Sequence, residues 1–126
     1  MVVVSISLND NILKEIDKIE KELGYSGRSE VIRTGARLLI SEFKNNEKIT
    51  GKINDILLLI HSPDSEDVVS EIKHNFEDVT ITQIHSHLRN KCLEIFILDG
   101  DAENIKEMVR LFQTSRKMDH VKLIIA

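Results

Sequence analysis

Two histidines and the single cysteine of the chain, His85, His87 and Cys92, lie close together in the sequence. His85 and His87 are two residues apart on a predicted strand, so both imidazole rings project from the same face of that strand. The polar segment 88–91 then predicts a hairpin loop, and Cys92 begins the next strand, where it can lie opposite the histidines. Two imidazoles and a thiolate placed in this way can share a transition metal ion.

The donor set leaves more than one metal open. Nitrogen and sulfur ligands in a plane suit Ni(II) or Cu(II), whereas the same ligands in a tetrahedron suit zinc. His74 stands near the end of a predicted helix, and geometry within one chain does not place it beside the other histidines, although a neighbouring subunit could bring it there. The alternative interpretation is a solvated or hydrogen-bonded pair of histidines.

The hydrophobic pattern of residues 52–126 predicts the elements that position these side chains. Strand, helix, strand, strand, helix and strand are expected at Ile53–Ile60, Ser65–Phe76, Val79–Leu88, Lys91–Leu98, Ala102–Ser115 and Val121–Ile125. This βαββαβ order is ferredoxin-like. Asp64 and Ser65 are candidate caps of the first helix, and the segment 99–101 marks the turn into the second.

Residues 1–46 have a different pattern, which predicts a strand and two helices. One face of the strand carries Val2, Val4, Ile6 and Leu8, and the other carries Val3, Ser5 and Ser7. Asn9 or Asp10 can begin the first helix and Gly24 can end it, and Ser29 can cap the second. The segment Asn45–Gly51 is polar and is predicted to be a linker.

One strand and two amphipathic helices bury too little apolar surface to be stable alone. We therefore predict a two-fold dimer in which the strands of two copies pair antiparallel above four helices. The two-stranded ribbon that results has a shape that fits the major groove of DNA.

Composition excludes several classes of protein. The chain has 126 residues, of which 41% are hydrophobic and 30% charged, so a large enzyme is excluded, and no nucleophile–base pair or glycine-rich phosphate loop indicates catalysis. The longest apolar run, Ile56–Ile60, is too short to cross a membrane, and a cytoplasmic location is expected. The net charge is −4, but residues 1–50 hold eight basic and eight acidic side chains. We expect weak non-specific binding to DNA.

The run 85–95, with His74 before it and Gly100-Asp101 after it, resembles the NikR nickel-responsive repressors, whose pattern is close to H-x10-H-x-H-x(4–5)-C-L-E. Gly24-Tyr25 and the segment 28–33 resemble the ribbon-helix-helix domain of that family. The resemblance implies an α+β protein with a βαα ribbon-helix-helix domain over residues 1–46 and a ferredoxin-like, ACT-type domain over residues 52–126. It also implies a homotetramer, in which two ribbon-helix-helix dimers flank a core of four ACT-like domains with nickel at its interfaces.

The resemblance also implies roles for individual residues. His85, His87 and Cys92 would bind nickel together with His74 of a neighbouring chain, and Glu94 could accept a hydrogen bond from a ligand ring. The residues expected to contact a palindromic operator in double-stranded DNA are Val3, Ser5 and Ser7, which match the base-reading positions, and Arg28 and Ser29, which could clamp a phosphate.

Two departures from the family pattern keep other functions open. Bacterial members carry a basic residue where this chain has Val3, and the acidic segment 61–67 replaces basic residues that approach DNA. A metal-binding protein that has lost operator recognition is therefore one alternative, and an ACT-type sensor of a small molecule is another. His61 and His120 match no ligand position and are expected to be surface or hydrogen-bonded histidines.

Overall fold

The computed structural model describes residues 1–47 and 49–126, which divide into two compact units, Met1–Asn45 and Asn46–Ala126. Helices α1 (Asp10–Leu23) and α2 (Arg28–Glu47) account for most of the first unit. The second unit contains β1 (Lys52–His61), the 3-10 turn η1 (Pro63–Ser65), α3 (Glu66–His74), β2 (Thr80–Leu88), β3 (Lys91–Asp101), α4 (Ala102–Thr114) and β4 (Met118–Ile125). The βαββαβ order predicted from the sequence is confirmed.

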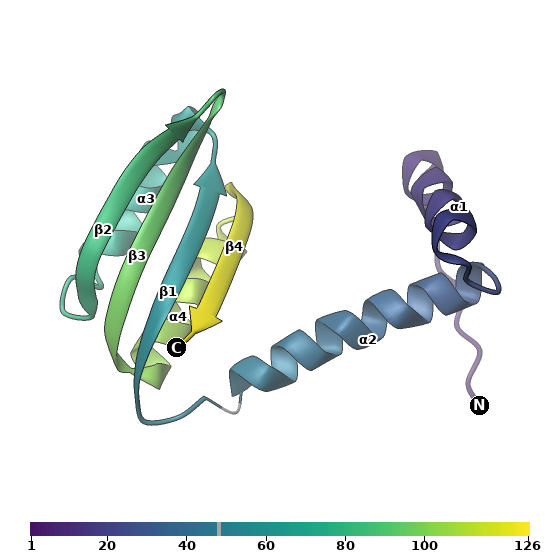
Figure 1. Ribbon diagram of the computed structural model, residues 1–126, viewed down its shortest axis with the longest axis horizontal. Helices are drawn as coiled ribbons and strands as arrows, with labels where there is room; N and C mark the ends of the chain where they lie inside the picture. The colour runs from purple at the N-terminus through teal and green to yellow at the C-terminus, as the bar shows by residue number, and fades with distance from the viewer. Residues whose placement is uncertain (48) are drawn as a thin grey trace. The chain divides into compact units, whose positions relative to one another are not determined.

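The strands of the second unit form a four-stranded sheet in the order β2-β3-β1-β4, and each neighbouring pair is antiparallel. Helices α3 and α4 lie on one face of this sheet (Figure 1). The order follows from chain connectivity, because each helical crossover passes over one strand position: α3 leads from β1 to β2 across the position that β3 fills, and α4 leads from β3 to β4 across β1. The ferredoxin-like fold is therefore confirmed.

The core of the second unit lies between the sheet and its two helices. Side chains alternate along β1 and β3, so every second residue points to the helices. The largest buried members of this core are Leu57, Leu59, Val69, Phe96, Leu98, Ile105, Met108 and Phe112. Cys92 and Glu94 have the same parity as Phe96 and are also buried. Strand alternation thus directs a thiol and a carboxylate to the helix-covered face.

The opposite face of the sheet, called here the open sheet face, is mostly apolar. Among the described residues of the second unit no helix covers it (Figure 1). Four of its side chains are between 36% and 48% exposed, on three of the strands. Its apolar residues are Ile56, Leu58, Ile60, Ile84, Leu88, Leu93, Ile95, Ile97 and Ile124, and the strand register places the polar residues Ser86, His120 and Lys122 on the same face. A continuous apolar surface of this kind is typical of an interface between protein molecules.

The helix ends of the first unit follow the predicted signals at α1. The Asn9 side chain accepts a hydrogen bond from the backbone N–H of Ile12 at 2.9 Å, and Gly24 ends the helix with a φ of 73°. Asn9 provides the cap and Asp10 is the first helical residue. The left-handed conformation at Gly24 explains why this position requires glycine.

The predicted strand over the first eight residues is absent from the single chain, where residues 1–9 have no regular secondary structure. A strand needs hydrogen bonds to a neighbour, and one chain provides none for this segment. Helix α1 buries no residue and α2 buries Val31, while Val2, Val4 and Ile6 are exposed. These exposed apolar side chains agree with the prediction that the first unit needs a second copy.

Two local predictions about the ends of α2 were wrong. Ser29 lies inside the first turn of α2 and does not cap it; the Glu30 carboxylate instead accepts hydrogen bonds from the backbone N–H and the hydroxyl of Ser26, both at 2.6 Å. The predicted linker Asn45–Gly51 is shorter, because α2 continues to Glu47; Lys48 lies outside the described residues. The side chain of the third residue of a helix can accept a hydrogen bond from an N–H that precedes the helix. Glu30 does this at the start of α2, where Ser29 was expected to provide the cap.

Of the two cap candidates at the start of α3, Ser65 is at the cap position and Asp64 is not. The Ser65 side chain makes no capping hydrogen bond there. The extra turn η1 precedes the helix, and Ser62 caps that turn by accepting from the backbone N–H of Asp64 at 3.3 Å. Proline at the first position of η1 fixes a helical φ there, which moves the chain into a helical conformation earlier than predicted.

Asp55 is a buried carboxyl in the core of the second unit, and within the described residues neither side-chain oxygen has a hydrogen-bond partner. Burial raises the pKa of Asp55 above its ordinary value of 3.8. The folded state therefore binds this proton more tightly than the unfolded state, so the unfolding free energy falls as the pH rises through the range between the ordinary and the raised pKa.

We expect Asp55→Asn to be more stable than the wild type at pH 7 by about 1 kcal/mol, because the variant buries no charge. The difference should shrink as the pH falls toward the ordinary carboxyl range. Urea unfolding at several pH values measures both effects, with the exposed Asp99→Asn as the matched control. Equal stability of wild type and variant at neutral pH would contradict the expectation.

Candidate metal centre

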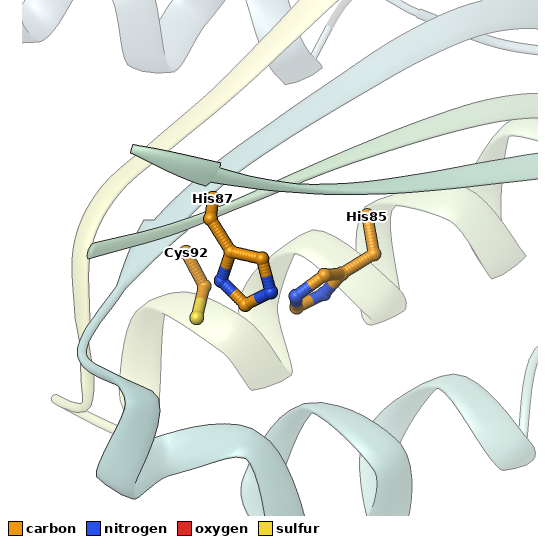
Figure 2. A group of neighbouring side chains, drawn as sticks. All are labelled: His85, His87 and Cys92. Atoms are coloured by element: carbon orange, nitrogen blue, oxygen red, sulfur yellow. The ribbon is translucent and has the colours of Figure 1, made fainter. Parts of the chain in front are cut away.

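The β2–β3 hairpin brings the two histidines and the cysteine together. His87 lies opposite Cys92 in the strand register, and His85 lies opposite Glu94. One ligand atom each from His85, His87 and Cys92 lies within 4.8 Å of the others. All three side chains point to the same side of the sheet, with the two rings directed toward one another (Figure 2); their centroids are 5.0 Å apart and their planes make an angle of 76°.

These side chains line a pocket of about 450 Å³. Helix α3 and the residues before it form one wall, and β2 and β3 form the other. The lining residues are Pro63, Glu66, Val69, Ser70, Lys73, Gln83, His85, His87, Cys92 and Glu94. A site that is open to solvent on one side and bounded by buried donors on the other can admit an ion or a side chain from another molecule.

Glu94 fixes the orientation of His85. This buried carboxylate accepts from Gln83 Nε2 at 2.9 Å and lies 2.9 Å from His85 Nδ1. A carboxylate can only accept, so Nδ1 carries the proton and Nε2 keeps a free lone pair. This carboxylate–histidine contact is the arrangement that commonly orients an imidazole for a metal ion.

The thiol of Cys92 is buried and unoxidised. Burial raises the pKa of Cys92, and the neighbouring carboxylates Glu66 and Glu94 raise it further. The group therefore holds its proton in the metal-free protein, and a metal ion must displace that proton to bind sulfur.

The residues present fit a divalent transition metal. Two imidazole nitrogens and one thiolate sulfur are available at the hairpin. The imidazole of His85 is oriented by the Glu94 carboxylate. Nitrogen and sulfur donors favour nickel, copper or zinc over magnesium or calcium, which prefer oxygen. Three candidate donors come from one chain, fewer than the four ligands that such metals commonly take.

His74 is not brought to this cluster within the single chain. It is the last residue of α3, its side chain is 77% exposed, and its Nδ1 lies 3.2 Å from the Glu77 carboxylate. An exposed imidazole at a helix end is free to reach another copy of the chain. Its assignment as a nickel ligand therefore depends on assembly.

Two neighbours of the cluster were not predicted as site residues. His61, at the end of β1, lies opposite Cys92 in the register, and Glu66 begins α3. Both have a ligand atom within 4.8 Å of one on Cys92. The prediction of His61 as a hydrogen-bonded histidine holds, since its Nδ1 bonds to the Ser62 carbonyl, but a surface position is wrong because the ring is fully buried. His120 is exposed, as predicted.

Strand parity was the signal that could have located His61. It has the same parity along β1 as Leu57 and Leu59, which point to the core. The ferredoxin-like order places β1 beside β3, so the end of one strand must adjoin the start of the other. Only the register between β1 and β3 decides that His61 lies opposite Cys92. For Glu66, at the start of α3, the sequence contains no signal of a position near Cys92.

The residues expected to contact DNA are exposed in the first unit. Val3 is 89% exposed, and Ser5 and Ser7 are exposed as well. The Arg28 guanidinium is paired with Asp17, with contacts of 2.8 Å from Nε and 3.1 Å from Nη2. This pairing lowers the pKa of Asp17 and leaves Arg28 only partly available to a phosphate.

Glu94→Gln should weaken nickel binding about 10-fold to 100-fold, because the neutral amide does not offer His85 Nδ1 a charged acceptor. Competition with a metal chelator of known affinity measures the change. Glu71→Gln, which alters an exposed carboxylate on α3, should bind nickel as the wild type does. Equal affinities in all three proteins would show that Glu94 does not support the metal ligands.

Two family models match the chain. The model of the NikR C terminal nickel binding domain matches residues 59–126, and that of the ribbon-helix-helix proteins of the CopG family matches residues 2–41. A solved structure of an uncharacterized protein from Thermotoga maritima has a TM-score of 0.55 and 19% identity, and the match covers 60% of this chain and 98% of that one. This likeness concerns the fold alone.

Curated relatives match nearly the full length. Proteins of Methanococcus vannielii and Methanocaldococcus jannaschii, whose names include the words nickel-responsive regulator, are 34% and 33% identical to this chain over 126 residues, and each alignment covers 97% of this chain and 89% of the relative. A relative from Methanococcoides burtonii with the same wording is 33% identical over 124 residues. The two matched domains are those of a family of regulators and not of a family of enzymes. With both domains matched and the donor cluster in the second, the chain belongs to the NikR family of nickel-responsive transcription regulators.

Proposed function

We propose that this protein is a nickel-dependent repressor that binds a palindromic DNA operator as a homotetramer. The observation that carries the proposal is the convergence of His85, His87 and Cys92 on one side of the β2–β3 hairpin. Nitrogen and sulfur donors of this kind suit nickel, copper and zinc, and the match to the NikR nickel binding domain favours nickel over Cu(II) and Zn(II).

In this proposal His74 of a second chain completes the coordination. Three donors come from one chain, and the pocket that they line is open to solvent. His74 is exposed at the end of α3, where its contact with the exposed Glu77 is easily exchanged for another. A ligand that bridges two chains stabilises the arrangement of subunits that brings the donors together, and so links nickel to quaternary structure.

Exposed apolar surfaces in both units support the homotetramer. The open sheet face offers an area in the second unit on which two copies can pack. In the first unit, Leu38, Leu39 and Phe43 of α2 are each more than half exposed. Each unit thus presents a separate surface for self-association, which is what a dimer of dimers requires.

The matched ribbon-helix-helix domain supports DNA as the partner. Ser5 and Ser7 would contact base edges from a two-stranded ribbon, Val3 would add an apolar contact, and the first turn of α2 at Arg28 and Ser29 would face a phosphate. The first fifty residues have no net charge, so we expect a shallow dependence of non-specific binding on salt concentration.

Selection of DNA from a random duplex library, with and without nickel, tests this function. We expect the full chain to enrich a palindromic sequence in the presence of nickel and none in its absence, because metal must fix the spacing of the two ribbon-helix-helix dimers. The Cys92→Ala variant is the control and should enrich no sequence under either condition. Enrichment that is independent of nickel would contradict the proposal.

A metal-binding protein without operator recognition is the second candidate. It is favoured by Val3, which offers no hydrogen bond to a base edge, and by the pairing of Arg28 with Asp17. The same selection separates the two functions. Tight nickel binding combined with no enriched sequence would identify this second function.

A further inference from the structure

His61 has a ring nitrogen that its surroundings leave without a partner. The side chain is fully buried, and Nδ1 lies 2.8 Å from the carbonyl oxygen of Ser62. A carbonyl only accepts, so Nδ1 carries the proton and the lone pair of the imidazole is on Nε2. Within the described residues this Nε2 is buried and makes no hydrogen bond. A buried nitrogen of this kind is costly unless something else binds it.

The groups near the His61 ring are of the types that can bind a metal ion. One ligand atom each from His61, Glu66 and Cys92 lies within 4.8 Å of the others. The Glu94 Oε2 atom lies 3.5 Å from Nε2, too far for a good hydrogen bond. The buried His61 ring therefore lies near one sulfur and two carboxylates, all of which can bind a metal ion.

We propose that His61, Glu66 and Cys92 form a second metal position, contained within one chain, that binds zinc. This position goes beyond the nickel site, because it uses two residues that are not nickel ligands and needs no donor from another subunit. Borderline-soft Zn²⁺ accepts mixed nitrogen, sulfur and oxygen ligands, and three protein ligands are the number found in zinc sites with an exchangeable fourth position.

The two positions compete because they share one sulfur atom. Cys92 belongs both to the cluster with His85 and His87 and to the cluster with His61 and Glu66. Zinc bound at the His61 side draws the thiolate toward β1 and away from the nickel ligands on β2. Zinc therefore weakens nickel binding, although the two ions bind at different positions.

Zinc titration of the metal-free full chain against a chromophoric chelator tests the proposal. We expect His61→Asn and Glu66→Gln each to weaken zinc binding about tenfold or more while the nickel–thiolate absorption band persists. His87→Ala should have the opposite pattern, losing nickel and keeping zinc. His120→Ala removes an exposed histidine outside both clusters and serves as the matched control.

A second measurement follows the competition. Added zinc should reduce the nickel–thiolate band of the wild type, and His61→Asn should resist that loss. Zinc affinity unchanged in Glu66→Gln and His61→Asn, or lost in His87→Ala, would place zinc at the nickel ligands and overturn the proposal. If circular dichroism shows that His61→Asn is unfolded, the half-exposed Glu66→Gln decides the outcome. Absence of a nickel band from the wild type would instead contradict the nickel function and leave the zinc result intact.

Discussion

Replacing Cys92 with alanine should abolish the nickel–thiolate absorption band and weaken nickel binding by about 100-fold or more, beyond the range expected for the loss of a supporting residue. Cys92 provides the single sulfur among the ligands near His85 and His87, and no other cysteine exists in the chain to replace it. Its position on β3 also connects the hairpin to the end of β1. Absorption spectroscopy of metal-free protein titrated with Ni(II), with chelator competition, measures both quantities.

His120→Ala is the control for this experiment. His120 lies on β4, is exposed and belongs to none of the donor clusters among the described residues. The control should have the absorption band and the nickel affinity of the wild type. A wild type without the band, or a Cys92→Ala variant that keeps nickel affinity, would exclude the proposed ligand set.

The second large effect is expected from Ile95→Lys on the open sheet face. Ile95 is in the central strand β3, between Leu58 on β1 and Ile84 on β2, at the middle of this apolar surface. In a separate chain the lysine would be hydrated, so the fold should survive. In a face-to-face assembly the charge would be buried, which costs about 3 kcal/mol or more, equivalent to a loss of about 100-fold in association.

Sedimentation and light scattering should find the tetramer in the wild type and dimers in Ile95→Lys. Gln113→Lys adds the same charge at an exposed position on α4 and should remain tetrameric. If His74 reaches the nickel of another chain across this assembly, the dimeric variant also binds nickel more weakly. A tetrameric Ile95→Lys variant would show that the open sheet face is not the tetramer interface.

Much of the second unit could be predicted because its residues specify secondary structure locally. Alternating apolar residues over β1 and β3 and the 3.6-residue spacing in α4 are strong signals, and the βαββαβ order then admits few topologies. Errors occurred at element ends, where short-range competition decides. Glu30 bonds Ser26 where Ser29 was expected to cap, and Ser62 begins a turn before the helix expected at Ser65.

The first unit depends on contacts that a single chain does not contain. Residues 2–8 alternate as a strand does, but alternation provides no hydrogen-bond partner, and the segment has no regular structure in one chain. The spacing of apolar residues therefore predicts which face of the segment will be buried. The surface that covers this face belongs to a second copy of the chain. Ribbon formation is a property of the assembly.

By itself the sequence determined that the three candidate donors lie together, because two histidines at a spacing of two must share a strand face and the hairpin returns the chain to place Cys92 nearby. It also determined the family, through the order of its two domains. Only the tertiary structure decided that His61 and Glu66 adjoin the same sulfur. The register between β1 and β3 and the packing of α3 on the sheet arise from the core as a whole, and no local spacing of residues encodes them.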